Sequence, residues 1–329
     1  MMNALVMHTA DEVKDMILRK QVLMLAAAEP ILMSLPSGEW IGGTIPYFMG
    51  DVGGCFDEQH ILVTEMPAAE GVSIKMYDGA SLPSIALDAP ENGCSFVIIP
   101  SGSAIHRQYA QEASGYDDMF MKPIAGWISG TSLSELGAVT PKVVDGRTGT
   151  MAENGAVVMH VALPDNVTAQ VDIVNIFTQD DSDVLSFPKG GFEVTDCLVN
   201  GKSAQFAAYV KEHGIDTRLP LVANLNGAMI NTSFQSVDEQ QGVVRFYAPV
   251  FSEYEYRLAR PVTDYAAAFA KAVPQQAGDA VFACNCILNY LYGELEGKQT
   301  GLRGPITFGE IAYQLVNQTL VYVTLHSRA

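Results

Sequence analysis

The 329-residue sequence predicts an α+β protein in which mixed β-sheets are stacked in layers and helices pack on the outside. Apolar, β-branched segments alternate with helical patterns along the chain, and the strand segments outnumber the helices. Apolar residues make up 48% of the chain, which is enough to bury a large core. The closing segment, residues 319–325, is apolar on both faces, and this pattern indicates a central strand covered on both sides.

The first half of the chain carries clear helix signals. Thr9 and Glu12 have the spacing of a capping box, in which each side chain satisfies the other's backbone N–H. Residues 22–25 form a short apolar run that fits a buried strand or a piece of buried helix equally well. Ser103 is in position to cap a helix that extends to about residue 113. Strands are predicted over residues 61–66, 72–77 and 96–99.

A stretch rich in Ser, Thr, Gly and Pro, residues 129–155, predicts a boundary between two halves. We therefore expect an N-terminal module over residues 1–145 and a C-terminal module over residues 150–329. Residues 42–63 and 304–321 resemble each other faintly, which suggests that the halves are related. In the second half, strands are predicted over residues 156–163, 171–177, 192–199, 219–223, 228–234, 243–249 and 280–283, and helices over 204–213 and 287–295.

The charge and the cysteines of the chain exclude several classes of protein. The formal net charge is −18 and no basic run is present, so neither nucleic acid nor a membrane is expected as a partner. The N-terminus is too charged for a signal peptide, and its longest apolar stretch is far shorter than the ~20 residues of a membrane helix. Five scattered cysteines indicate reduced thiols, and we expect a cytoplasmic protein.

The motifs of common cofactors are missing from the sequence. The glycine clusters lack the Gly-x-Gly-x-x-Gly pattern and no Gly-Lys-Ser/Thr loop exists, so we expect no nucleotide and no other cofactor. No second Cys or His pair has zinc-site spacing, so we expect no metal. For His106 and Arg107, a haem or phosphate site is one interpretation and a surface helix end is the better one. His160 lies in an apolar strand, where a hydrogen-bonded core residue is more common than a ligand.

Cys284 and Cys286 precede a predicted helix and could be reactive. The partial positive charge of a helix N-terminus lowers a thiol pKa, so either residue could act as a nucleophile. No histidine lies nearby in the sequence, and two buried structural thiols explain the pair better.

Several other residues combine polarity or small size with an apolar setting. Glu310 must find a partner there, and either a ligand amine or backbone N–H groups would serve. Asn285, Asn317 and Thr319 suit ligand hydrogen bonds and structural bonds equally. Gly42 and Gly43, which follow Trp40 in an aromatic strand, indicate either close approach of a ligand or a simple bulge, with the bulge favoured.

Two regions of the second half resemble the C-terminal module of the FIST family. Residues 194–204 (Val-Thr-Asp-Cys-Leu-Val-Asn-Gly-Lys-Ser-Ala) are similar to its opening strand, turn and helix. Residues 282–286 (Phe-Ala-Cys-Asn-Cys), 304–311 (Gly-Pro-Ile-Thr-Phe-Gly-Glu-Ile) and 317–321 (Asn-Gln-Thr-Leu-Val) are similar to its close. The likeness covers roughly residues 150–329. The sequence departs from the family at Asn289, near a usual Arg, and at residues 305–308, which are less aromatic.

The resemblance implies a non-catalytic sensory protein for a small, amino-acid-like metabolite, which signals through a separate protein. A cysteine-dependent enzyme and a structural subunit, such as a homo-oligomer without a ligand, are the alternatives. The expected ligand-binding residues are Cys284, Asn285, Cys286, Thr307, Gly309, Glu310, Asn317 and Thr319, together with Trp40, Gly42 and Gly43.

Overall fold

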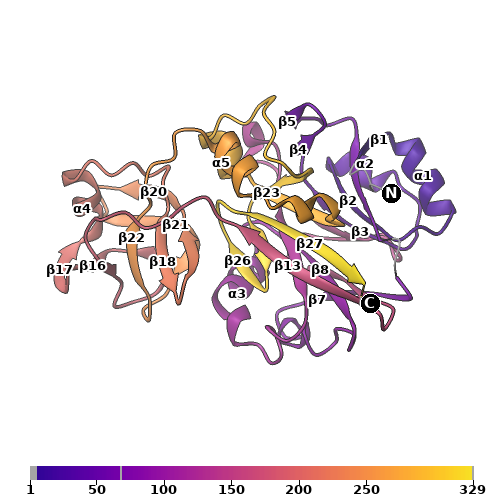
Figure 1. Ribbon diagram of the computed structural model, residues 1–329, viewed down its shortest axis with the longest axis horizontal. Helices are drawn as coiled ribbons and strands as arrows, with labels where there is room; N and C mark the ends of the chain where they lie inside the picture. The colour runs from indigo at the N-terminus through magenta and orange to yellow at the C-terminus, as the bar shows by residue number, and fades with distance from the viewer. Residues whose placement is uncertain (1–5, 67–68, 328–329) are drawn as a thin grey trace.

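The computed structural model describes residues 6–66 and 69–327 and confirms the predicted α+β class. Three six-stranded sheets form the main body, helices flank them on the outside, and a smaller lobe stands to one side (Figure 1). Within the described residues, no helix is both long enough and apolar enough to cross a membrane.

Three segments of the main body, which we call units 1, 2 and 3, repeat one order of elements. Each has an outer strand, a first inner strand, a helix, a second inner strand, a β-hairpin and a returning strand. Unit 1 consists of β1 (Val6–His8), α1 (Ala10–Leu18), β2 (Leu23–Ala27), α2 (Glu29–Met33), β3 (Trp40–Thr44), the hairpin β4 (Tyr47–Gly50) and β5 (Gly53–Phe56), and β6 (Ile61–Glu65). The ambiguous apolar run at residues 22–25 is thus a strand.

Units 2 and 3 follow the same order with different insertions. Unit 2 consists of β7 (Gly71–Tyr77), η1 (Leu82–Ser84), β8 (Gly93–Pro100), α3 (Ala104–Glu112), η2 (Ala113–Gly115), β9 (Ile124–Ser129), η3 (Leu133–Glu135), the hairpin β10 (Val143–Asp145) and β11 (Thr150–Ala152), and β12 (Ala156–Ala162). Unit 3 consists of β13 (Val167–Val174), the inserted lobe, α5 (Tyr265–Ala272), η4 (Gln275–Asp279), β23 (Phe282–Cys286), α6 (Ile287–Tyr292), β24 (Gly304–Thr307), the hairpin β25 (Glu310–Ala312) and β26 (Gln314–Val316), and β27 (Leu320–Ser327).

The hairpins interlock the three units. Within each unit the two inner strands are parallel, and the returning strand pairs antiparallel with the first of them and with the outer strand. Each hairpin leaves its own unit: β4 pairs with β24, β10 with β3, and β25 with β9. Each of the three main-body sheets therefore holds strands from two units, and the three units form a closed cycle.

The internal likeness noted in the sequence has a structural counterpart. Residues 42–63 and 304–321 span corresponding strands of units 1 and 3, from the second inner strand to the returning strand. The repeat is nevertheless threefold, because unit 2 has the same connectivity. The chain thus contains three related units rather than two halves.

The predicted module boundary at residues 145–150 is wrong. It falls inside the hairpin of β10 and β11, whose strands pair from Val143 with Ala152 to Asp145 with Thr150. Small and turn-forming residues mark a tight turn as readily as a linker between domains, which explains the misplaced boundary. The separate substructure is instead the lobe, which has a hydrophobic core of its own.

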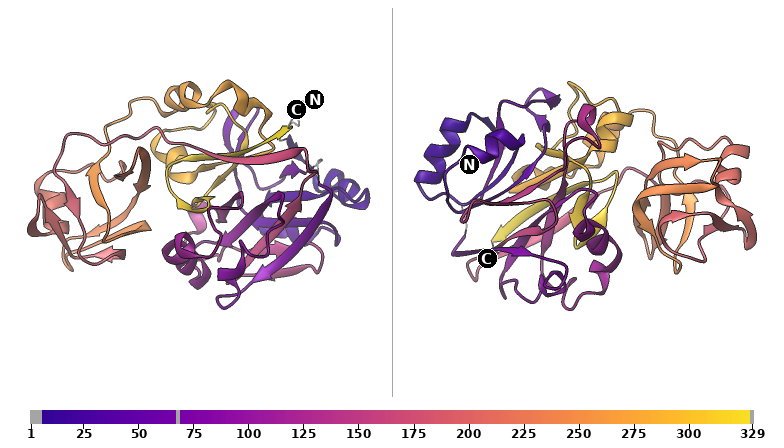
Figure 2. Two further views of the ribbon diagram at one scale, coloured as in Figure 1. Left: turned by 60° about the horizontal axis from the view of Figure 1, so that its bottom comes forward. Right: turned by 180° about the vertical axis from the view of Figure 1, so that it is seen from behind.

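The lobe is an insertion between β13 and β23 of unit 3 (Figure 2). A six-stranded and a three-stranded sheet enclose a core in which the rings of Phe187 and Phe206 lie 5.1 Å apart. The predicted strand over residues 192–199 is broken at Thr195, and α4 begins after Gln205, which accepts a hydrogen bond from the Ala208 N–H. The elements are β14 (Leu185–Ser186), β15 (Gly191–Val194), β16 (Asp196–Val199), β17 (Lys202–Gln205), α4 (Phe206–Glu212), β18 (Leu221–Leu225), β19 (Ala228–Thr232), β20 (Phe234–Asp238), β21 (Val243–Val250) and β22 (Glu255–Leu258).

Local signals of the sequence were more reliable than the domain boundary. The capping box of Thr9 and Glu12 is present, and Ser103 caps α3. His160 is a fully hydrogen-bonded core residue, as predicted. Its Nδ1 lies 2.7 Å from Ser95 Oγ and its Nε2 lies 2.8 Å from the Tyr77 hydroxyl, so neither nitrogen lacks a partner.

Candidate functional site

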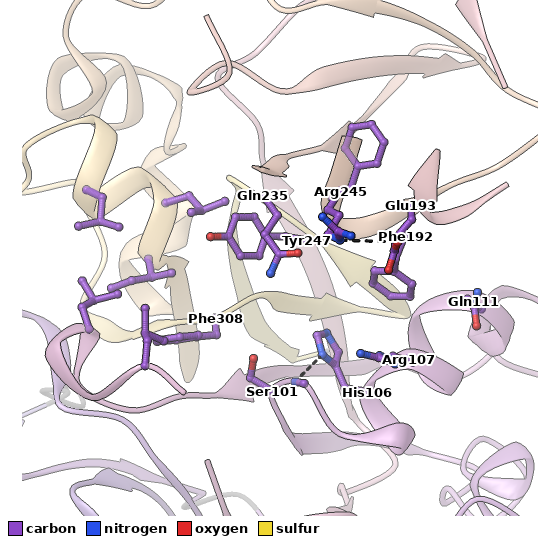
Figure 3. A pocket seen from close by; sticks show the side chains of 17 residues that line it. Ser101, His106, Arg107, Gln111, Phe192, Glu193, Gln235, Arg245, Tyr247 and Phe308 are labelled. Atoms are coloured by element: carbon purple, nitrogen blue, oxygen red, sulfur yellow. Dashed lines mark hydrogen bonds and ion pairs between the residues drawn. The ribbon is translucent and has the colours of Figure 1, made fainter. Parts of the chain in front are cut away.

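A cavity of about 830 Å³ lies where the lobe meets units 2 and 3 (Figure 3). Its body side is formed by segments that follow the carboxyl ends of the parallel strands β8, β9, β23 and β24. Its lobe side is formed by β15, β20 and β21. In sheets with parallel strands, ligands bind outside these carboxyl ends, where loops and helix N-termini present backbone N–H groups.

The first turn of α3 places His106 in the cavity wall. Gly102 takes a φ of +74°, and Ser103 Oγ then accepts the His106 N–H at 3.0 Å. The Gly102 N–H donates to His106 Nδ1 at 3.1 Å, so the ring proton lies on Nε2. Nε2 is buried and has no hydrogen-bond partner among residues 6–66 and 69–327. Burial lowers the pKa of His106 to about 4, so the ring is a neutral hydrogen-bond donor at neutral pH.

The charges in the cavity wall differ from those of the chain as a whole. Arg107 on α3 and Arg245 on β21 both line the cavity, and Glu193 on β15 lies 3.6 Å from the Arg245 guanidinium. Within the described part of the chain, Arg107 forms no ion pair. Two arginines and one glutamate leave the wall positive in a chain of net charge −18. Guanidinium groups bind carboxylates and phosphates through paired hydrogen bonds, so the wall favours an anionic group.

The rest of the wall is largely apolar. Phe308 lies against Gly130, where an added Cβ would come within 2.1 Å of the Phe308 ring. Ile287 and Leu288 on α6 and Phe192 on β15 extend the apolar surface. An anionic head and an apolar body are therefore the ligand features that this cavity matches.

A second cavity of about 620 Å³ occupies a similar place between units 1 and 2. Glu29, Glu58 and Glu135 line it, and no Lys or Arg is among its described lining residues. Lys142 lies beside it and donates to both Glu29 oxygens at 2.7 Å. This wall repels anions, and its described residues include no buried, unpartnered side chain of the kind that His106 provides.

A family model covers almost the whole chain. The family of unknown function DUF6976 matches residues 8–326, which span all three units and the lobe. The chain belongs to this family. A search of curated proteins found no match.

In this DUF6976 member the N-terminal candidate residues are buried inside the main body. Trp40, Gly42 and Gly43 lie in β3, outside the described lining of both cavities. Trp40 Nε1 donates to the Pro36 carbonyl at 2.9 Å. A Cβ on Gly43 would lie 2.6 Å from Trp127, so a side chain of unit 2 approaches this glycine. The bulge interpretation is wrong, since β3 pairs in unbroken register with β2 and β10.

The C-terminal candidate residues do come together, in a buried polar cluster of unit 3. Thr307 Oγ1 donates to the carbonyls of Asn285 at 3.2 Å and Gly309 at 3.0 Å. Glu310 Oε2 accepts the N–H of Thr319 at 3.2 Å and its hydroxyl at 2.7 Å. The remaining members are Cys284, Cys286 and Asn317. None of these side chains lines the cavity, although Ile287 and Phe308, their neighbours in sequence, do.

The two cysteines of this cluster lack the properties of nucleophiles. Both thiols are buried, and burial raises the pKa of Cys284 and of Cys286 well above the ordinary value. The nearby Glu310 carboxyl raises both pKa values further. A thiol that stays protonated at neutral pH is a poor nucleophile. Across the described ranges, no group of three His, Cys, Asp or Glu side chains could hold a metal ion.

His106 and Arg107 are candidate functional residues that the sequence interpretation assigned to a surface helix end. Their signal was a buried strand followed by Ser101-Gly102-Ser103 and a capped helix, which places the first helical turn at a carboxyl end of the sheet. Arg245 and Tyr247 had no comparable signal, because their place in the wall depends on how the lobe packs.

Proposed function

We propose that this protein is a non-catalytic binding protein that takes up a small amphipathic carboxylate in the cavity between lobe and body. The observation that carries the proposal is the buried Nε2–H of His106, a donor without an acceptor, in a wall that also presents Arg107. A carboxylate would accept from both groups at once. The apolar surface of Phe308, Leu288 and Phe192 would cover the body of the ligand.

The position of the cavity supports a sensory role. The chain enters and leaves the lobe through segments of unit 3, Asn231 and Ser233 of the lobe hydrogen-bond to the turn before β27, and the described residues of the lobe form one wall of the cavity. A ligand that bridges the two walls would favour one arrangement of lobe and body, which a separate signalling partner could recognise. The FIST resemblance, which stays a prediction, agrees with such a role and with an amino-acid-like ligand.

The observations give less support to a cysteine-dependent enzyme. The two candidate thiols are buried and protonated, and no histidine imidazole is among the groups that act on them. We therefore propose that binding, rather than catalysis, is the function of the cavity.

Titration calorimetry with a panel of aliphatic and aromatic carboxylates, with and without an amino group, tests this proposal. We expect at least one carboxylate to bind, and Arg107→Gln to weaken it about 10–100-fold, because a hydrogen bond to a charged group contributes about 1.5–3 kcal/mol. Arg19→Gln, which changes an exposed arginine at the C-terminal end of α1 and outside the described cavity lining, is the matched control. Equal affinities of the Arg107 variant and the wild type, or no binding across the panel, would contradict the proposal.

A further inference from the structure

One position distinguishes unit 3 from units 1 and 2. In each unit, the last residue of the first inner strand pairs with the last residue of the second inner strand. The three second inner strands can therefore be aligned from their ends, and the residues two places before each end correspond to one another. Each of these residues pairs with an incoming hairpin strand, and the partners are Phe48, Val144 and Glu310. All three are buried. Units 1 and 2 have an apolar side chain at this position, and unit 3 has a carboxyl group.

A second polar residue of unit 3 also replaces apolar residues of the other units. Asn285 is the last residue but one of β23, and Ala26 and Ile99 hold that place in β2 and β8. Asn285 Oδ1 accepts from Asn289 Nδ2 at 3.0 Å and from the Cys286 N–H at 2.8 Å. The shared topology requires neither Asn285 nor Glu310, so a binding role explains them better than a role in folding.

Three acceptor oxygens of this cluster have no donor among the described residues: Glu310 Oε1, Asn289 Oδ1 and Asn317 Oδ1. Their residues are at most 1% exposed. Thr319 links them, because its N–H and hydroxyl donate to Glu310, its carbonyl accepts from Asn289 Nδ2 at 3.2 Å, and Asn317 is two residues before it. Buried acceptors without donors destabilise a fold, so binding of a ligand or ion that donates hydrogen bonds to them is favoured.

We propose that Glu310, Asn289 and Asn317 bind a primary ammonium group. Such a group offers three N–H donors to three acceptors. It also supplies a positive charge, and no Lys or Arg is among the groups that act on Glu310. The neighbouring Cys286 thiol is only a weak donor, and a water molecule would leave the Glu310 carboxyl protonated, whereas a positive charge favours its ionised form.

The ammonium group can come from two sources, the free ammonium ion or the amino end of a ligand in the cavity. Phe308, two residues before Glu310, and Ile287, next to Cys286, both line the cavity, so the cluster lies behind that wall. The second source rests on the proposed function, whereas the first does not.

Binding should depend on pH. Burial raises the pKa of Glu310 to about 8, against the hydrogen bonds from Thr319, and the flanking Cys284 and Cys286 thiols stay neutral over the same range. An ammonium guest must displace the proton on Glu310. Its affinity should therefore rise about tenfold per pH unit as the pH approaches the pKa from below.

A buried ammonium ion is observable by NMR when its N–H protons exchange slowly with water. In ¹⁵N-labelled ammonium chloride, we expect the full chain to show such a signal and to melt about 2 °C higher than in sodium or choline chloride. Glu310→Gln preserves the shape of the side chain and removes its charge, so it should lose both effects. Glu255→Gln, at an exposed carboxyl group on β22, is the matched control and should keep both.

The source is distinguished by comparing amino acids with the same carboxylates lacking the amino group. A preference for the amino acid that Glu310→Gln abolishes assigns the site to the ligand's amino end. An ammonium effect without that preference assigns it to the free ion. The ammonium site is overturned if carboxylates bind, but ammonium chloride gives no slow-exchange NMR signal and no rise in melting temperature, and the amino group does not change carboxylate affinity. The proposed function would stand in that case.

Discussion

Units 1 and 2 and unit 3 share one connectivity but differ in what they bury. The hairpins of the first two bury Phe48 and Val144 where they join the next sheet, whereas the hairpin of unit 3 buries Glu310 at the corresponding position. Unit 3 also carries the lobe, and both distinctive features lie close to the cavity. Comparing corresponding positions of the three units thus distinguishes two kinds of residue. Positions with the same kind of side chain in all units build the fold, and positions at which unit 3 alone is polar mark the candidate site.

The largest expected effect comes from moving the carboxyl group to another unit. Val144→Glu buries a carboxylate where the structure supplies no counterpart of the Thr319 hydroxyl, because the residues corresponding to Thr319 in units 1 and 2 are Ile61 and Gly155. An uncompensated buried charge costs about 3–5 kcal/mol, so urea denaturation should show a fall of that size in the free energy of unfolding.

The reciprocal change provides the control. Glu310→Val gives unit 3 the side chain that unit 2 has at this position. We expect it to lower the free energy of unfolding by less than half as much as Val144→Glu, because it removes a desolvated carboxyl group together with its hydrogen bonds. If Val144→Glu were tolerated as well as Glu310→Val, the distinction between the units would fail.

A smaller effect is expected from the two buried histidines of unit 2, His106 at the cavity and His160 in the core. Burial lowers both pKa values from 6.5 to about 4. As the pH falls through 6.5, these histidines are protonated in the unfolded chain, whereas in the folded chain they stay neutral until about pH 4. Stability is therefore complete above pH 6.5 and decreases between 6.5 and 4, by at most about 3 kcal/mol per histidine.

Urea titrations across this pH range measure the effect. His160→Gln should reduce the slope of stability against pH relative to the wild type, whatever it does to stability at pH 7. A carboxylate bound at His106 should leave the His160 contribution unchanged, because both nitrogens of His160 bond within unit 2, to Ser95 and Tyr77. An unaltered slope in the His160 variant would show that this ring titrates outside the range.

The sequence predicted what local patterns determine and missed what the packing of distant segments determines. Helix caps at Thr9 and Ser103 and the role of His160 were predicted because neighbouring residues decide them. The C-terminal candidates lie together in the fold, since β23, β25 and the turn before β27 carry polar residues in apolar strands, and their binding role stays a prediction. The cavity was missed because its walls come from two units and the lobe, and exchanged hairpins leave no periodic signal in the chain.

A substitution at Gly43 tests whether this glycine of unit 1 is needed for packing or for ligand binding. Gly43→Ala would bring a Cβ within 2.6 Å of Trp127 and 2.7 Å of Ile98, both buried in unit 2. Overpacking of this kind costs about 1–3 kcal/mol, and thermal unfolding should show it. Because the cavity lining lies elsewhere, carboxylate affinity should stay within about twofold of the wild type. A variant of unchanged stability that lost affinity would return this glycine to the binding site and weaken the view that residues of unit 1 serve only the fold.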